Sequence, residues 1–134
     1  MPNEVYAKLY EMLSNFATQS IKCLMLINGG AAIAILAFIG NFVGQENINI
    51  NAIKSTLPGL SNALSEFSFG VMSATLASFL AYLCQLLFLE TAYIKTGIII
   101  RFLAILSAIY SLITFYNGVT FSYNAFITLS NTIK

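Results

Sequence analysis

Three long apolar stretches dominate the pattern of hydrophobic and polar positions along the chain. Residues 23–43 and 67–89 contain no charged residue, and residues 98–117 contain only Arg101. Because an α-helix rises 1.5 Å per residue, about 20 residues cover the hydrocarbon core of a bilayer, which is about 30 Å thick. The pattern therefore predicts an all-α integral membrane protein with three transmembrane helices.

The apolar character of the third stretch continues beyond Asn117 and Gly118, over residues 118–132. One interpretation is a single long third helix whose C-terminal extension leaves the bilayer. The other is a break or kink near Asn117 and Gly118 followed by a short interfacial helix, because glycine is a weak helix former.

The first 20 residues carry apolar side chains at helical spacing. Val5, Leu9, Met12 and Phe16 recur at steps of four, three and four among polar residues, which is typical of an amphipathic helix. Such a helix over residues 1–20 would lie on the membrane surface, pack against a partner, or continue into the first span as one helix of about 40 residues. We divide the chain into this helix and a transmembrane helical domain over residues 21–134.

The connection between the first two apolar stretches is polar and weakly charged. Pro58 and Gly59 interrupt the middle of residues 44–65. Because proline removes a backbone donor and breaks helices, this segment is predicted to be a loop with a short helix on either side of Pro58.

The composition agrees with a membrane protein and excludes several kinds of chemistry. Apolar residues make up 58% of the 134 residues and charged residues 8%, against about 25% charged in soluble domains. The net charge of +1 is spread along the chain, so there is no basic block typical of nucleic-acid binding. Since histidine is absent and carboxylates are few, we expect no enzyme activity, no bound metal and no cofactor.

The basic residues predict the orientation of the three spans. The side of the N-terminus holds four of the six: Lys8, Lys22, Lys95 and Arg101. Lys54 and Lys134 lie on the other side, so the positive-inside rule predicts a cytoplasmic N-terminus, with an inverted or dual topology as the alternative. In this orientation Cys23 and Cys84 both lie toward the cytoplasmic leaflet, and we expect reduced, packed thiols.

Each predicted span carries a row of small residues at helical spacing, which lets helix backbones approach closely. The first row comprises Gly30, Ala34, Ala37, Asn41 and Gly44, the second Gly70, Ala74, Ala77, Ala81 and Cys84, and the third Ala104, Ala108, Ser111, Gly118, Ser122 and Ala125. Gly40 adds a G-x-x-x-G pair with Gly44. Because three helices cannot bury every small surface, we predict a homo-oligomer; the alternative is a compact monomer.

Polar residues inside the apolar stretches are candidates for lining a pore: Asn28, Ser78, Gln85, Arg101, Ser107, Ser111, Thr114 and Asn117. The alternative for the hydroxyls is a hydrogen bond to their own helix. Asn28 and Gln85 carry amides that need partners, so they are expected at an interhelical contact or a pore. Arg101 either extends to the headgroups or, repeated around an axis, forms a basic ring that favours anions, with Glu90 as its counter-ion.

The first two spans, roughly half of the chain, resemble a group of small, largely uncharacterised bacterial multi-spanning membrane proteins from prophage and mobile-element neighbourhoods, and the third span is similar to the closing helix of that group. The matching positions are Asn28, Gly29, Gly30, Ala31, Ala32, Leu36, Phe38 and Gly40, then Phe67, Phe69, Gly70 and Tyr82, and finally Ser111, Phe115 and Gly118. The resemblance implies a location in the bacterial inner membrane. It also implies a role as an effector that depolarises the cell when a partner protein of an anti-phage system senses infection.

These features predict an oligomeric membrane channel or pore-forming effector with an anion preference. The alternative is a non-conducting membrane anchor or accessory subunit, whose N-terminal helix recruits a cytoplasmic partner or small ligand. A small transporter is disfavoured, because no acidic residue lies within the predicted spans.

Overall fold

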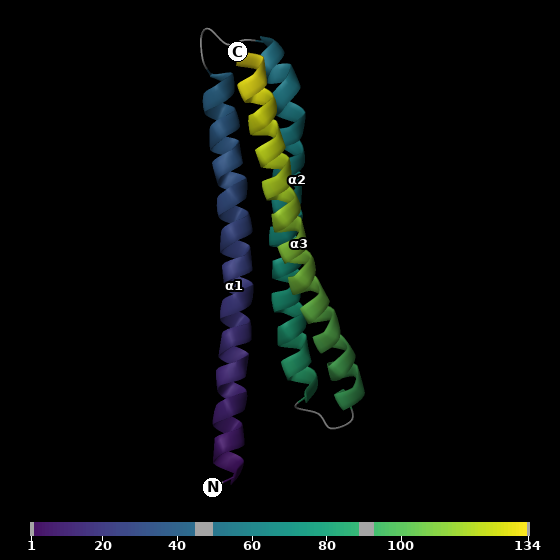
Figure 1. Cartoon of the computed structure of the whole chain (residues 1–134). Helices are drawn as coiled ribbons and strands as arrows, with labels where there is room; N and C mark the ends of the chain where they lie inside the picture. Colours follow the sequence, from purple (N-terminus) through teal and green to yellow (C-terminus); the bar gives the residue numbers. More distant parts are fainter. Residues whose placement is uncertain (1, 45–49, 89–92, 134) are drawn as a thin grey trace.

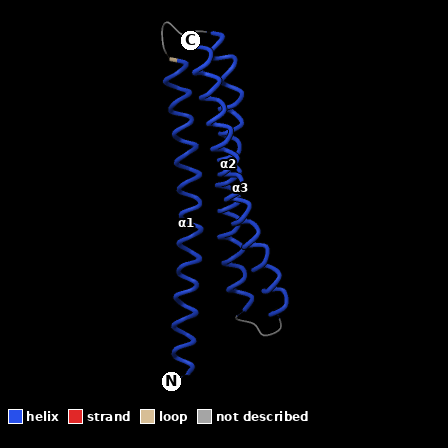
Figure 2. The backbone as a smooth tube through the Cα atoms, in the orientation of Figure 1, coloured by secondary structure: helices blue, strands red, loops and turns tan. Residues whose placement is uncertain are grey.

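The computed structural model describes residues 2–44, 50–88 and 93–133, which form three long helices (Figure 1). These are α1 (Pro2–Val43), α2 (Ile50–Phe88) and α3 (Ile94–Ile133). All three are long and apolar enough to cross a membrane, and the described part of the chain contains no strand (Figure 2). The predicted all-α membrane fold is confirmed.

Helices α2 and α3 form an antiparallel hairpin and lie side by side along their whole length (Figure 1). Helix α1 packs mainly on α2 and contacts α3 little. It lies against the hairpin toward Val43 and separates from it toward the N-terminus, so the N-terminus, the last turn of α2 and the first turn of α3 are at one end of the molecule (Figure 1). The C-terminus lies at the opposite end.

Helix α1 is a single helix of 42 residues, so the structure agrees with the interpretation in which residues 1–20 continue into the first span. Hydroxyl groups support this continuity, because Thr18 and Ser20 donate to the carbonyls of Ser14 and Phe16 at 2.9 Å. At 1.5 Å per residue, each of the three helices is about 60 Å long, or twice the thickness of the hydrocarbon core.

Of the predicted loop over residues 44–65, residues 45–49 lie outside the described residues. Over residues 50–65 the prediction is wrong, because α2 begins at Ile50 and continues through Pro58 as one helix. The buried face of this segment explains the difference. Leu60 and Ala63 are fully buried, and a Cβ at Gly59 would lie 2.9 Å from the Cβ of Ala125, so α2 and α3 are in close contact there. The free energy gained by packing against α3 exceeds the cost of the backbone hydrogen bond that is lost because proline has no N–H donor.

A break near Asn117 and Gly118 is likewise wrong, because α3 is one helix of 40 residues. Gly118 is buried and serves close packing. A Cβ at this position would lie 2.6 Å from the ring of Phe67, which also lies 5.8 Å from the ring of Phe115 between centroids. The glycine makes room for an aromatic ring of α2.

One hydrophobic cluster joins α1 to the hairpin near the C-terminal half of α1. It is formed by Ile35, Leu60, Ala63, Phe67 and Ala125. Next to this cluster, the rings of Phe38 and Phe126 make an edge-to-face contact at 5.0 Å between centroids, a geometry that aromatic pairs prefer.

Candidate functional site

Three residues, one from each helix, form a buried hydrogen-bonded contact that we call the polar node: Asn28, Gly70 and Ser111. The Asn28 side chain is fully buried. Its Nδ2 lies 3.0 Å from the Leu24 carbonyl, 3.2 Å from Ser111 Oγ and 3.4 Å from the Ser111 carbonyl. Ser111 Oγ in turn donates to the Gly70 carbonyl at 2.8 Å.

Gly70 is required at the polar node for steric reasons. A Cβ at this position would overlap the carboxamide of Asn28. The close approach brings the Asn28 amide within hydrogen-bond distance of Ser111 in the buried interior. Asn28 Oδ1 has no hydrogen-bond partner, so the node fixes the amide through its donor side only.

The eight candidate pore-lining residues fall into three groups. Asn28, Ser111 and Thr114 are buried between helices, and Thr114 Oγ1 donates to the Ser111 carbonyl at 3.0 Å. Asn28 therefore makes the interhelical contact that was one of its two expected roles. Ser107 and Asn117 are half-buried, while Ser78, Gln85 and Arg101 are exposed. A pore-lining role stays a prediction for all eight.

The three rows of small residues also differ in their surroundings. Every member of the second and third rows is buried or half-buried, and contacts between Gly70 and Ser111 and between Phe67 and Gly118 tie α2 to α3. Every member of the first row is exposed, and added Cβ atoms at Gly30 and Gly40 would meet nothing within 4 Å. Among the expected packing residues, Gly70, Ala74, Ala77 and Gly118 thus pack within the chain, whereas Gly30, Ala34, Gly40 and Gly44 do not.

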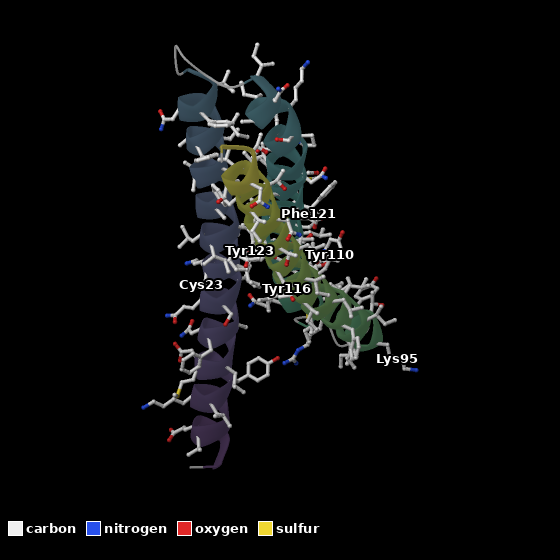
Figure 3. All side chains as sticks on the ribbon, turned by 45° about the horizontal axis from the view of Figure 1, so that its top comes forward. Cys23, Lys95, Tyr110, Tyr116, Phe121 and Tyr123 are labelled. Carbon is white, nitrogen blue, oxygen red and sulfur yellow. The ribbon has the colours of Figure 1, made fainter. Side chains whose placement is uncertain are left out.

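Both cysteines are free, but their surroundings differ. Cys84 is buried, and its Sγ donates to the Gly97 carbonyl at 3.3 Å, so the expectation of a packed thiol is correct there. Cys23 is exposed on α1 (Figure 3), and the same expectation is wrong. It lies seven residues before Gly30, or about two helical turns, and so extends the first row of small residues.

A cavity of about 430 Å³, which we call the wedge, opens between the N-terminal half of α1 and the hairpin. Its walls come from all three helices, and Arg101 is the one charged residue among the 16 that line it. Gln85 Nε2 approaches Ser14 Oγ at 3.5 Å across the gap between α2 and α1. The wedge is therefore an apolar space with a single cationic group.

The wedge and the α1 residues that line it were not predicted from the sequence. Ser14, Ala17, Ile21 and Leu24 belong to its wall and recur at steps of three and four, which is a helical face. This helical spacing is present in the sequence, but the angle at which α1 separates from the hairpin cannot be predicted from it. Among the described residues, Arg101 forms no ion pair; its expected counter-ion Glu90 lies outside them.

The described residues contain no group of three or more histidine, cysteine or acidic side chains suited to a metal ion. No protein-family model, curated protein or solved structure matches the chain. The arrangement of the helices is therefore the basis for assigning a function.

Proposed function

We propose that the protein is a pore-forming membrane subunit that assembles as a homo-oligomer through the exposed side of α1. The interface is the α1 outer face: Cys23, Gly30, Ala34, Ala37, Asn41 and Gly44. The observation that carries the proposal is that the second and third rows of small residues are buried or half-buried in the hairpin, while every member of the first row, on α1, is exposed. Small residues on a membrane helix favour close helix–helix contact, and a second copy supplies the same surface.

The depth of Lys22 supports a water-filled path beside this face. Helices α1 and α2 are antiparallel, and the contacts of Asn28 with Gly70 and of Ser14 with Gln85 set their relative height. By this register, Lys22 lies level with Ala77, near the middle of the uncharged part of α2. A charged side chain at such a depth faces water or a partner, or extends to the headgroups.

In a homo-oligomer that forms through the α1 outer face, the residue that determines the ion preference of the pore is also different. The sequence pointed to Arg101, but Arg101 lines the wedge on the hairpin side of α1. Lys22 is exposed and directly precedes Cys23 of the α1 outer face. Repeated in each subunit, Lys22 forms the basic ring that raises the local concentration of anions.

The biological setting of this proposal rests on the resemblance of the sequence. In that setting the pore depolarises the bacterial inner membrane as the effector of an anti-phage system. The N-terminal end of α1, before the residues that line the wedge, then faces the cytoplasm, where a partner protein reaches it.

Oxidative cross-linking tests the interface with a native cysteine. In a Cys84→Ser background, membranes treated with copper phenanthroline should yield a disulfide-linked dimer of twice 14.6 kDa through Cys23. Gly30→Leu should abolish the dimer, because a large side chain separates the α1 outer faces. As a control, the cysteine is moved to the exposed position of Phe102 on α3. Equal cross-linking from both positions would contradict the interface.

Reversal potentials test the pore and its selectivity. Purified protein in liposomes should conduct in a chloride gradient, and Lys22→Glu should move the reversal potential toward cation preference. Arg101→Gln should leave it unchanged. Absence of conductance in the liposomes would overturn the pore proposal. If Arg101→Gln shifts the reversal potential as much as Lys22→Glu does, the basic ring is formed by Arg101.

One observation favours a second candidate, a membrane anchor that recruits a cytoplasmic partner. Nearly all described side chains of α1 over residues 4–20 are exposed, which leaves this segment free to bind another protein. Liposomes that do not conduct, together with capture of a partner that requires residues 1–20, would favour the anchor.

A further inference from the structure

The wedge combines two features of a ligand site inside a membrane protein. Its volume of about 430 Å³ lies within the range of small-molecule pockets, about 300–1,000 Å³. Its walls are mostly apolar, and its one charged group is the Arg101 guanidinium, which has no ion pair among the described residues. We propose that the wedge binds one anionic phospholipid, with its phosphate at Arg101 and an acyl chain between α1 and the hairpin.

The walls are suited to an acyl chain. Alanines from all three helices line the cavity, namely Ala17, Ala81, Ala104 and Ala108, and their short side chains leave the space that separates α1 from the hairpin. Six leucine and isoleucine side chains add further apolar wall, and the rest of the lining besides Arg101 is formed by Tyr10, Ser14, Ser20, Cys84 and Gln85. An acyl chain buried against them avoids leaving an unfilled cavity, whose walls lose their packing contacts.

The position of Arg101 is suited to a phosphate. Its Cα lies seven residues after the start of α3, or about 10 Å along the helix. Because side chains on a helix tilt toward its N-terminus, the guanidinium extends toward the start of α3. The guanidinium donates in a planar fork that matches phosphate oxygens. On the predicted topology this end faces the cytoplasmic leaflet, where anionic lipids are concentrated.

The size of the wedge favours a lipid over a helix from a second copy. An α-helix is about 10–12 Å across, so a single turn of 5.4 Å occupies about 400–600 Å³. The whole wedge therefore holds at most one helical turn. An extended acyl chain fits the same volume, and the phosphate of the lipid supplies a negative charge for Arg101, which has no ion pair among the described residues.

Native mass spectrometry of detergent-purified, delipidated protein tests the site. Phosphatidylglycerol and phosphatidylcholine with identical acyl chains are titrated separately. We expect about fivefold tighter binding of phosphatidylglycerol, the factor given by one basic residue near an anionic headgroup. Arg101→Gln should remove the preference. Lys95→Gln is the matched control, because Lys95 lies on the same helix, is absent from the wedge lining and extends outward (Figure 3).

A second variant tests the acyl-chain pocket independently of charge. Ala17 is exposed and lines the wedge, so Ala17→Phe should fill it, weaken binding of both lipids and leave the helical circular dichroism unchanged. Equal binding of the two lipids by the native chain, or equal effects of Arg101→Gln and Lys95→Gln, would overturn the proposal. If Ala17→Phe abolishes cross-linking through Cys23 but leaves lipid binding unchanged, the wedge is occupied by a second copy of the chain and the lipid proposal is wrong.

The lipid site and the pore can fail separately. Lipid binding is measured in detergent and depends on Arg101, whereas conductance is measured in liposomes and depends on Lys22. If the protein binds the lipid but does not conduct, the pore proposal is rejected and the lipid site is retained.

Discussion

At the scale of single residues, Asn28 determines how α1 sits on the hairpin. Its amide lies within hydrogen-bond distance of Ser111 on α3, while Gly70 of α2 provides the space for it. Such interhelical hydrogen bonds contribute about 0.6 kcal/mol each in membranes and up to about 1.7 kcal/mol. The steric fit at Gly70 adds specificity, because a residue with a Cβ cannot accept the amide in this position.

A pair of glycine variants separates steric fit from helix propensity. Gly70→Ala should destabilise the protein by about 1–3 kcal/mol, as is typical when an extra carbon is forced into a packed site. Gly30→Ala should not destabilise the monomer, because nothing lies within 4 Å of the added Cβ. Unfolding of both variants in mixed micelles with increasing dodecyl sulfate gives the two free energies. Equal free energies for the two would show that the polar node does not fix α1.

The sequence predicted the chemistry of Asn28 but not its partners. An amide within an apolar stretch needs hydrogen bonds, and that requirement is visible in the sequence. Which glycine and which serine meet it depends on the relative rotation and height of three helices. The same limit applies to Cys23 and Cys84, since both lie in apolar stretches and only packing distinguishes the exposed thiol from the buried one.

At the scale of helices, α2 shows that tertiary packing outweighs a local breaking signal. The segment over residues 50–66 is polar and contains Pro58, yet it is helical throughout. Pro58 is exposed, while Leu60 and Ala63 are buried, so the proline lies on the side of α2 away from its packed face. The apolar stretches alone predicted the three spans, whereas the extension of α2 beyond its span depends on contact with α3.

Replacement of Pro58 should stabilise the protein. Pro58→Ala restores the backbone donor to the Lys54 carbonyl and removes the clash with it, which costs a helix interior about 3 kcal/mol. We therefore expect stabilisation by about 1–3 kcal/mol and a higher Tm, measured by circular dichroism in micelles. Asn62→Ala, at an exposed position of the same helix, should change stability by no more than about 0.5 kcal/mol. A lower Tm for Pro58→Ala would show that the proline is needed for the curvature of α2.

At the scale of the whole molecule, the uncharged stretches of α1 and α2 overlap only in part. The contacts of Asn28 and Ser14 with α2 place Lys22 level with Ala77 and Glu66 level with Ile33. The overlap between Lys22 and Glu66 covers about ten residues, or about 15 Å. A hydrocarbon core of about 30 Å therefore includes at least one of these two charges.

This offset could not be predicted from separate spans. The length and composition of a stretch predict a span but not its height relative to the other helices. Each span taken alone contains no acidic residue. Relative height depends on the polar node. Glu66 is half-buried and lies level with the apolar part of α1, so it becomes a candidate for an acidic group at membrane depth, although the separate spans predicted none.

The positions of the chain ends give a topology that can be tested. The N-terminus and the first turn of α3 lie at one end of the molecule, and the C-terminus lies at the other (Figure 1). Four of the six basic residues are on the N-terminal side, so this end should face the cytoplasm. An N-terminal fluorescent protein should therefore be fluorescent, and a C-terminal alkaline phosphatase should be active outside.

Because the margin of basic residues is small, the orientation should respond to charge. Replacing Lys8 and Lys95 with Gln leaves two basic residues on each side, and should yield a mixed population in which phosphatase activity falls by about half. Replacing Glu4 and Glu11 with Gln is the control, since acidic residues contribute little to orientation. Both termini on the same side in the native chain would mean an even number of crossings, which would require one of the helices of about 60 Å to lie along the membrane.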